Sequence, residues 1–292
     1  MRCGSDFVQK GQRAPYVYNG RAERTTGGRT RGLSLGCSLD GDSDRIVFYA
    51  HGGDGNVDRD GGMPFTLLDG DKISSLLASF VRQELSALSS PPCRPLSVAV
   101  VQTAYANDAS AAYLRSLDVT TECTATGVMY LHHAASKYDV GIYFESNGHG
   151  TVLFSQIFHE LVRSRRDNET RRQTVARKRL AALARIMNPS VGDALSDLLA
   201  VMGVLYLGGN GAASVGRWAG MYRDRPTRQR QVRVGDRSVV MTNATETRVT
   251  SPSILQRVLD LESRAMARGG AGGAGLPPRC FVRPSLVPPT VA

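Results

Sequence analysis

The sequence has no long hydrophobic run, no paired cysteines and a single tryptophan. No stretch of about 18 or more apolar residues occurs, and the opening residues contain no apolar signal core. We therefore expect a cytoplasmic protein with no membrane partner. The five cysteines are odd in number and scattered without a CxxC pair, which indicates free thiols rather than a zinc site or a redox dithiol.

The sequence is also short of acidic residues in its second half. Residues 1–150 contain 14 Lys and Arg against 16 Asp and Glu, so residues 151–292 contain 36 − 14 = 22 against 26 − 16 = 10. The net charge of +10 therefore arises entirely from the second half. Such an excess attracts anions, and phosphorylated small molecules, nucleic acid and acidic partners all remain open.

Alternating apolar strands and amphipathic helices predict an α/β protein with mainly parallel strand pairing. Strands are expected at 46–50, 96–101 and 140–144, and helices at 73–85, 109–117, 128–137, 155–187 with a break near 167–168, and 191–207. The remainder differs in character. We expect a surface loop at 9–36, two strands at 230–234 and 238–241, a helix at 253–268 and a flexible linker at 269–275.

The segment Asp40-Gly41-Asp42-Ser43-Asp44-Arg45 predicts a divalent-metal loop. Three carboxylates at alternate positions of a tight loop can converge on one hard cation, and oxygen ligands alone favour Mg²⁺. A calcium EF-hand would need Gly and Glu where Arg45 and His51 stand, and Asp44 does not fit a haloacid dehalogenase. An acidic surface turn is the simplest alternative.

Glu145-Ser146-Asn147-Gly148-His149-Gly150 follows a predicted buried strand. The position is one where the crevice of an α/β sheet collects ligands, and the carboxylate, amide and imidazole suit a polyhydroxylated sugar. An ordinary turn at a strand end explains the same residues, because each of these residue types is common in loops.

Together these stretches resemble the phosphoacetylglucosamine mutase family of the α-D-phosphohexomutase superfamily. The similarity extends in order and spacing from residue 3 to residue 285. It includes Leu39 to Val47, Leu68 to Ile73, Val101 to Asn107, Thr126-Gly127-Val128, Leu131-His132, Tyr143 to Gly150, Val191 to Ala194, Asp236-Arg237 and Arg279 to Ser285.

The resemblance implies an isomerase that moves phosphate between O6 and O1 of N-acetylglucosamine, on the route to UDP-N-acetylglucosamine. A phosphoserine of the enzyme donates its phosphate and recovers the other one, with Mg²⁺ as cofactor. By this resemblance Asp40, Asp42 and Asp44 would bind the metal and Arg45 would steady the phosphoserine. The sugar phosphate would contact Gly127, Glu145, Asn147, His149, Arg283 and Ser285. Phosphoryl transfer depends mostly on positioning and charge neutralisation, which a metal and an arginine supply.

The sequence also departs from the family pattern. No Ser-His-Asn-Pro loop occurs, Leu286 and Val287 follow Ser285 where the family has Gly-Thr-Glu, and Met129 stands where the family usually has Lys. We therefore interpret the chain as a fragment that lacks the phosphoserine domain and the end of the phosphate-binding domain, and we expect residues 1–292 alone to turn over substrate negligibly.

Three further patterns are interpreted as structural. His132-His133 cannot easily share one metal ion because adjacent helix residues point about 100° apart. Asp71 is expected to cap the helix that follows it. The Arg-rich stretch from Arg163 to Arg179 could bind nucleic acid, but a solvated helix face is the simpler interpretation.

The predicted organisation is two mixed α/β phosphohexomutase-type domains followed by a partial α+β domain. We expect a metal-loop domain at 1–95, a sugar-binding domain at 96–224 and a partial phosphate-binding domain at 225–292. Two alternatives to the mutase remain: an inactive relative that binds Mg²⁺ or sugar phosphate only, and an Arg-rich nucleic-acid-binding protein. The oligomeric state is not predicted.

Overall fold

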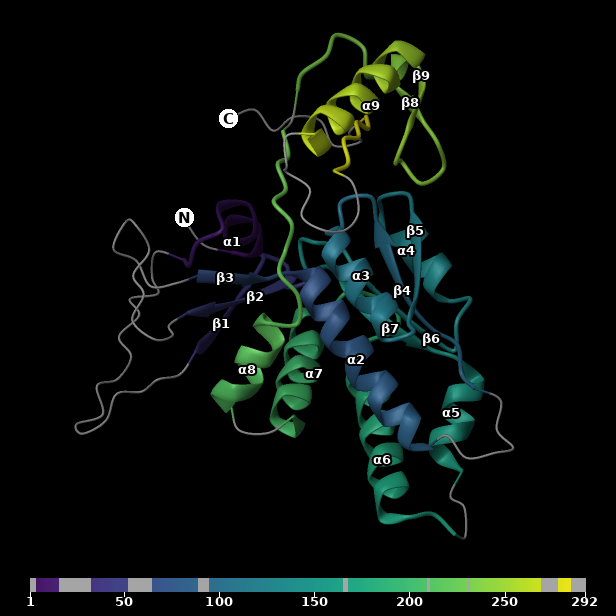
Figure 1. The fold of residues 1–292 in the computed structure, drawn as a ribbon. Coiled ribbons are helices and arrows are strands. Elements are labelled where there is room, and N and C mark those ends of the chain that lie inside the picture. Colours follow the sequence, from purple (N-terminus) through teal and green to yellow (C-terminus); the bar gives the residue numbers. More distant parts are fainter. Residues whose placement is uncertain are drawn as a thin grey trace, which may run out of the picture.

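The structure is a computed structural model that describes residues 4–15, 33–51, 65–88, 95–164, 168–208, 211–230, 232–268 and 278–284. It forms a two-sheet body with a smaller unit above it (Figure 1). An extended segment, green in Figure 1, connects this C-terminal unit to α8. Most of the loop predicted at 9–36 and all of the linker predicted at 269–275 lie outside the described residues.

The first sheet is antiparallel and holds the predicted metal loop at its hairpin. Its order is β1 (Ser34–Leu39), β2 (Ile46–His51) and β3 (Phe65–Leu68). The short helix α1 (Ser5–Gly11), which periodicity did not predict, packs Val8 against Val47 and Tyr49 of β2. Residues 40–45 connect β1 to β2.

The second sheet is mixed, with strand order β5-β4-β6-β7. β4 (Val98–Thr103) pairs in parallel with β5 (Thr120–Thr124) and β6 (Val140–Phe144), and β7 (Gly150–Phe154) returns antiparallel. The helices α3 (Asp108–Ser116) and α4 (Val128–Ala135) connect these strands. The expectation of mainly parallel pairing was therefore wrong: tight hairpins join β1 to β2 and β6 to β7, and such connections force antiparallel pairing.

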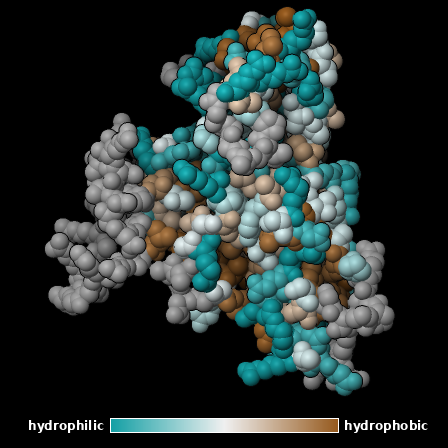
Figure 2. Space-filling view, viewed as in Figure 1, coloured by the Kyte–Doolittle hydropathy of each residue, from teal (hydrophilic) through white to brown (hydrophobic). Residues whose placement is uncertain are grey.

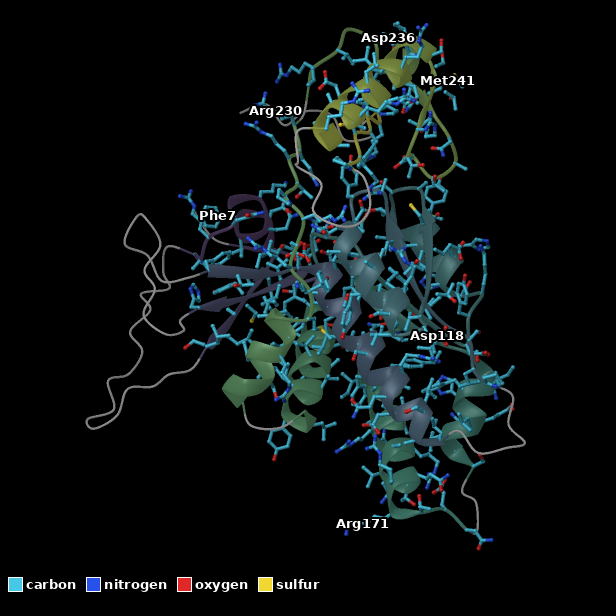
Figure 3. All side chains as sticks on the ribbon, viewed as in Figure 1. Phe7, Asp118, Arg171, Arg230, Asp236 and Met241 are labelled. Atoms are coloured by element: carbon cyan, nitrogen blue, oxygen red, sulfur yellow. The ribbon has the colours of Figure 1, made fainter. Side chains whose placement is uncertain are left out.

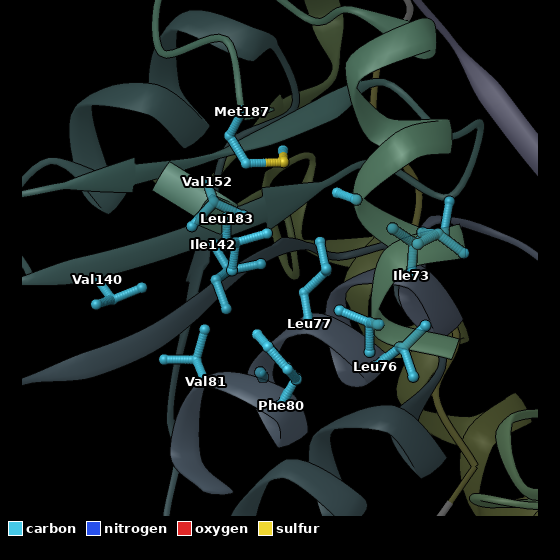
Figure 4. Packing of buried hydrophobic residues seen from close by; sticks show 14 of the residues in the cluster. Ile73, Leu76, Leu77, Phe80, Val81, Val140, Ile142, Val152, Leu183 and Met187 are labelled. Carbon is cyan, nitrogen blue, oxygen red and sulfur yellow. The ribbon is translucent and has the colours of Figure 1, made fainter. Parts of the chain in front are cut away.

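Helix α2 (Gly70–Leu88) lies at the centre of the protein and packs against both sheets. It inserts Ile73, Leu77 and Val81 into one hydrophobic core, which also contains residues of β6, β7 and α6 (Figure 4). Four further helices complete the body. They are α5 (Gln156–Arg163), α6 (Arg171–Ile186), α7 (Ala194–Leu207) and α8 (Gly211–Ala219). The core includes Phe48 and Ile142 from the two sides of residue 95, and the domain limits at 95 and 224 stay predictions.

The arginines of α6 are largely paired with carboxylates. Arg177 binds Glu169 at 2.9 Å, and Arg179 and Arg172 approach the buried Glu84 at 2.8 and 3.4 Å. Arg171 points away from the protein at the lower end of α6 (Figure 3). Helix α6 therefore uses part of its charged face to pack against the rest of the protein.

The C-terminal unit contains β8 (Met241–Thr242), β9 (Val249–Ser251) and α9 (Ser253–Arg268). The helix has the predicted bounds, but the strand predicted at 230–234 was wrong and the one predicted at 238–241 is confirmed only at Met241, where β8 begins. The described part of 230–234 has no strand, and 238–239 belongs to a 3₁₀ turn. Val232 and Val234 are 74% and 57% exposed, so these apolar side chains do not pack against a core formed by the described residues. Figure 3 places Arg230 on the extended segment and Asp236 and Met241 on the C-terminal unit.

None of the helices in the described ranges combines the length and apolar character needed to span a membrane.

Candidate functional site

The three aspartates of the predicted metal loop converge. Asp40, Asp42 and Asp44 each offer a carboxylate oxygen, and these oxygens lie within 4.8 Å of one another. The turn is closed at its base, where the Arg45 amide donates to Asp40 Oδ1 at 3.2 Å and the Asp40 amide donates to the Arg45 carbonyl at 3.4 Å. Ser43 adopts a left-handed backbone with φ of +60°, which turns the chain between the last two aspartates.

This donor set fits a hard divalent cation. All three groups are carboxylates, which magnesium and calcium prefer. Asp44 Oδ1 is buried and accepts no hydrogen bond among the described residues, although Arg45 Nε lies 3.4 Å away. A buried carboxylate oxygen without a hydrogen bond is costly unless a cation binds it. The arrangement therefore suits Mg²⁺ held by oxygen ligands.

Arg45 lies against three carboxylates. Its Nε is 3.2 Å from Asp40 and 3.4 Å from Asp44, and its Nη1 is 3.5 Å from Asp6 on α1. The side chain remains 35% exposed, so the guanidinium can still reach an external anion. Its acidic neighbours hold it beside the metal loop.

The predicted sugar loop is bonded directly to the metal loop. Arg45 and His149 form a β-bridge, and the Ile46 amide donates to the Gly148 carbonyl at 3.2 Å. His149 Nδ1 also lies 3.0 Å from Asp44 Oδ2. Gly148 is required here, since its φ is +88° and a Cβ would lie 1.9 Å from the Ile46 carbonyl oxygen. Two stretches about one hundred residues apart in sequence thus form one surface.

Inside the sugar loop, side chains and backbone hold one another. Asn147 Nδ2 donates to Glu145 Oε2 at 3.4 Å, and the His149 amide donates to Asn147 Oδ1 at 3.0 Å. The Val191 to Ala194 motif lies against the same place, because the Ala194 amide donates to the Ser43 carbonyl at 3.0 Å. This last contact was not predicted from sequence.

Two further predicted residues, Gly127 and Arg283, lie where the C-terminal unit meets the second sheet. Gly127 precedes α4 with φ of +130°, a conformation that favours glycine. Arg283 donates from Nε to the Tyr105 hydroxyl at 2.7 Å and lies 5.1 Å from the centre of that ring. Ser285 lies outside the described residues. Met129, which replaces the usual lysine, is 84% exposed on α4.

A buried acidic cluster beside the sugar loop was missed by the sequence analysis. Asp69, not Asp71, caps α2: Asp69 Oδ1 accepts the amides of Asp71 and Lys72 at 3.1 and 3.3 Å. Asp71 is only 2% exposed and accepts the Asn107 amide at 2.8 Å, so the prediction of a cap at Asp71 was wrong. Burial and the neighbouring Asp224 raise the pKa of Asp69 to about 7, and burial followed by Asp69 raises the pKa of Asp71.

This cluster holds the segment that leads to the C-terminal unit. The buried Lys72 donates to the Tyr222 carbonyl, lies 3.5 Å from the centre of the Tyr222 ring and 4.0 Å from Asp224. Asn107 makes a pair of hydrogen bonds with Arg225, donating to its carbonyl at 3.0 Å and accepting its amide at 3.1 Å. The extended segment is therefore fixed to the body as far as Arg225.

A cavity of about 870 Å³ lies elsewhere, between α2, α7 and α8. Figure 2 shows hydrophobic residues lining a hollow between α2 and α7. None of the predicted site residues lines this cavity, so it is separate from the carboxylate and sugar loops.

Comparison with known proteins places these features in context. Residues 69–209 match the family described as "Phosphoacetylglucosamine mutase AMG1, domain III". The chain is 37% identical to the phosphoacetylglucosamine mutase of Homo sapiens over 285 residues, covering 97% of this chain and 46% of that protein. It is 40% identical to the Saccharomyces cerevisiae protein of the same name over 270 residues, covering 89% and 43%.

Solved structures show similarity to the same kind of enzyme. The fold is similar, with a TM-score of 0.79 and 34% identity, to Aspergillus fumigatus N-acetylphosphoglucosamine mutase in complex with GlcNAc-6P and magnesium. That alignment covers 99% of this chain and 51% of the other. The chain spans about half the length of the curated relatives it matches.

Proposed function

Because this chain belongs to the phosphoacetylglucosamine mutase family, we propose that it supplies the metal loop, the sugar loop and part of the phosphate site of a mutase. The reaction interconverts N-acetylglucosamine 6-phosphate and 1-phosphate. The observation that carries the proposal is the backbone junction of the two loops, the bridge from Arg45 to His149. It sets the carboxylates for a cation beside the groups that suit a sugar.

In this proposal the metal loop receives the phosphorylated serine of the family. Asp40, Asp42 and Asp44 would hold a Mg²⁺ ion through their carboxylate oxygens. The ion, when bound, neutralises charge on the transferring phosphoryl group. Arg45, positioned by Asp40 and Asp44, steadies the phosphoserine through its exposed edge.

The sugar loop orients the other reactant. Glu145, Asn147 and His149, held together by the hydrogen bonds of their loop, bind sugar hydroxyls. Gly127, which precedes α4, contacts the same substrate. Arg283 and Ser285 bind the phosphate that does not react, which explains why an arginine comes to this edge from the C-terminal unit. Fixing both ends of the substrate converts binding energy into alignment for phosphoryl transfer.

The first test is metal binding by the 292-residue protein. Isothermal titration calorimetry with Mg²⁺ compares the wild type with Asp42→Asn. Loss of one ligand charge is expected to weaken Mg²⁺ binding at least about tenfold. The control is Asp118→Asn, the same substitution at a carboxylate that is 95% exposed and pairs with Arg82. Equal Mg²⁺ affinity in wild type and Asp42→Asn would refute the proposed ligand set.

The family also suggests the wider role. The product serves the synthesis of UDP-N-acetylglucosamine, and we propose that this occurs in the cytoplasm. The nucleic-acid alternative has less support, because several arginines of α6 are paired with Glu84 and Glu169.

A further inference from the structure

The loop between β8 and β9 is a built turn that presents one carboxylate. Asn243 organises it, since Asn243 Oδ1 accepts the amides of Thr247 and Arg248 at 2.9 and 3.0 Å. The Glu246 amide donates to the Asn243 carbonyl at 3.0 Å. At the tip, Glu246 has a left-handed backbone with φ of +56°. That conformation is uncommon for residues other than Gly, Asn and Asp, so an observed case suggests a role for the side chain.

The carboxylate of Glu246 joins the C-terminal unit to the second sheet. Its Oε2 accepts the backbone amide of Thr126 at 3.0 Å and lies 3.7 Å from Arg283 Nε. The side chains of Glu246 and Arg283 are each 18% exposed, so the contact is largely shielded from water. Ion pairs in such surroundings are weakened less by salt than exposed ones.

The partners of Glu246 are those that a phosphate group would use. A phosphate accepts from backbone amides and from arginine, and Thr126 supplies one such amide just ahead of Gly127 and α4. The Thr126 hydroxyl oxygen is also buried and has no hydrogen-bond partner among the described residues. The Glu246 carboxylate therefore occupies a position with donors for an anion.

We propose that Glu246 is an internal anion that docks the C-terminal unit on the sugar-binding sheet and is displaced by the substrate phosphate. The inference rests on the proposed role of Arg283 in phosphate binding. Arg279 contacts the neighbouring loop after β4 and the start of α3 independently, donating to the Ala106 carbonyl at 3.0 Å and lying 2.9 Å from Asp108. The unit thus stays nearby while the Glu246 contact exchanges for phosphate. Glu246 is a positioning residue, since it acts through Arg283 and Thr126.

Calorimetry with N-acetylglucosamine 6-phosphate in the presence of Mg²⁺ tests the displacement. Glu246→Gln keeps the shape of the side chain but removes its charge, so it is expected to bind the sugar phosphate about threefold to tenfold more tightly than wild type. Glu262→Gln removes the same charge from an exposed position on α9 and is expected to bind as wild type does. Arg283→Ala is expected to weaken binding in either background.

Amide hydrogen exchange tests the docking without any ligand added. In Glu246→Ala the Thr126 amide loses its acceptor, and its exchange is expected to quicken at least about tenfold, while amides of β6 exchange as in wild type. Unchanged exchange at Thr126 would overturn the proposal. So would faster exchange combined with sugar-phosphate affinity in Glu246→Gln equal to or below that of wild type.

The same experiments separate this inference from the proposed function. If Arg283→Ala leaves the affinity for the sugar phosphate unchanged, Arg283 does not bind phosphate, and both the proposed phosphate site and the displacement fail. If Arg283→Ala weakens binding but Glu246→Gln does not strengthen it, the phosphate site stands and only the displacement fails.

Discussion

Two junctions in this protein differ in the kind of bond that forms them. The metal loop meets the sugar loop through main-chain groups, namely the bridge from Arg45 to His149 and the Ile46 amide on the Gly148 carbonyl. The C-terminal unit meets the second sheet through side chains, including Arg283 on Tyr105 and Glu246 on Thr126. Main-chain junctions keep their geometry when side chains change rotamer, whereas side-chain junctions can separate and form again.

The difference indicates how the two parts of the site contribute. The carboxylates of the metal loop and the groups proposed to bind the sugar are set in place by folding, so they form a fixed half. Arg283, the proposed phosphate ligand, belongs to a unit held by side-chain contacts that can break and form again, so it forms a separable half. Three changes, in order of expected effect, can break or sharpen this contrast.

Gly148→Ala tests the main-chain junction and has the largest expected effect. The new Cβ would lie 1.9 Å from the Ile46 carbonyl oxygen at a φ of +88°, so the loop must move away from β2. We expect a loss of about 3 kcal/mol in the free energy of unfolding, together with weaker Mg²⁺ binding. Denaturant unfolding and calorimetry measure the two effects.

Gly41→Ala is the matched control for that change. It lies in the same metal loop, but nothing lies within 4 Å of its added Cβ. Stability and Mg²⁺ affinity close to wild type are expected. If Gly148→Ala also leaves stability and Mg²⁺ affinity close to wild type, the main-chain junction does not fix the two loops.

Asn107→Asp tests the attachment of the connecting segment and should have an intermediate effect. Aspartate still accepts the amides of Ala109 and Arg225, but it cannot donate to the Arg225 carbonyl at neutral pH. We expect exchange of the Arg225 amide to rise about tenfold, which corresponds to about 1.4 kcal/mol. Asn168→Asp, at an exposed position, serves as the control. Equal exchange in both variants would show that Asn107 does not hold the segment.

Asp197→Asn, on the helix α7 whose first residue Ala194 bonds to the metal loop, tests the fixed half through pH. Near pH 4 it should have the smallest effect of the three changes. Burial, and then Asp193, raise the pKa of Asp197 to about 8, and Asp197 Oδ2 accepts no hydrogen bond among the described residues. Between about pH 4 and pH 8 the folded state therefore keeps a proton on Asp197 that the unfolded state has already lost. Wild-type stability consequently falls as pH rises through this range.

In Asp197→Asn that fall should be shallower, so the stability of the variant relative to wild type should rise from pH 4 to pH 8, with little difference at pH 4. Melting temperatures across this pH range measure it, with Asp118→Asn as the exposed control. An identical slope in wild type and Asp197→Asn would mean that Asp197 is not protonated in the folded protein at neutral pH.

Helices with clear periodicity could be predicted from sequence, and long-range features could not. The limits of α9 follow from its apolar spacing, as do those of α2 within a few residues. The sequence predicted the wrong cap for α2, Asp71 and not Asp69, because aspartate is a good capping residue at either position. It is decided by the Asn107 amide, which binds Asp71 from another part of the chain. The strand predicted at 230–234 failed for a similar reason, since the described residues provide no partner strand.

In the candidate site, too, local features could be predicted from the sequence and long-range contacts could not. Each loop was predicted from its own residue types, and the convergence of Asp40, Asp42 and Asp44 is a local property of a short turn. The β-bridge between Arg45 and His149 depends on the packing of two sheets, which no local sequence pattern encodes. Glu246 carried no signal in the sequence, because its left-handed backbone results from the bonds of Asn243.

The fixed point at Arg225 has a consequence for binding affinity. Because Asn107 holds Arg225 to the body, any movement of the C-terminal unit relative to the body must occur about residues beyond Arg225. As the proposed phosphate ligand, Arg283 would have an effective concentration near the sugar loop on the order of millimolar, set by chain length and not by protein concentration. Lengthening the tether after Arg225 would dilute this arginine without altering a single contact that it makes.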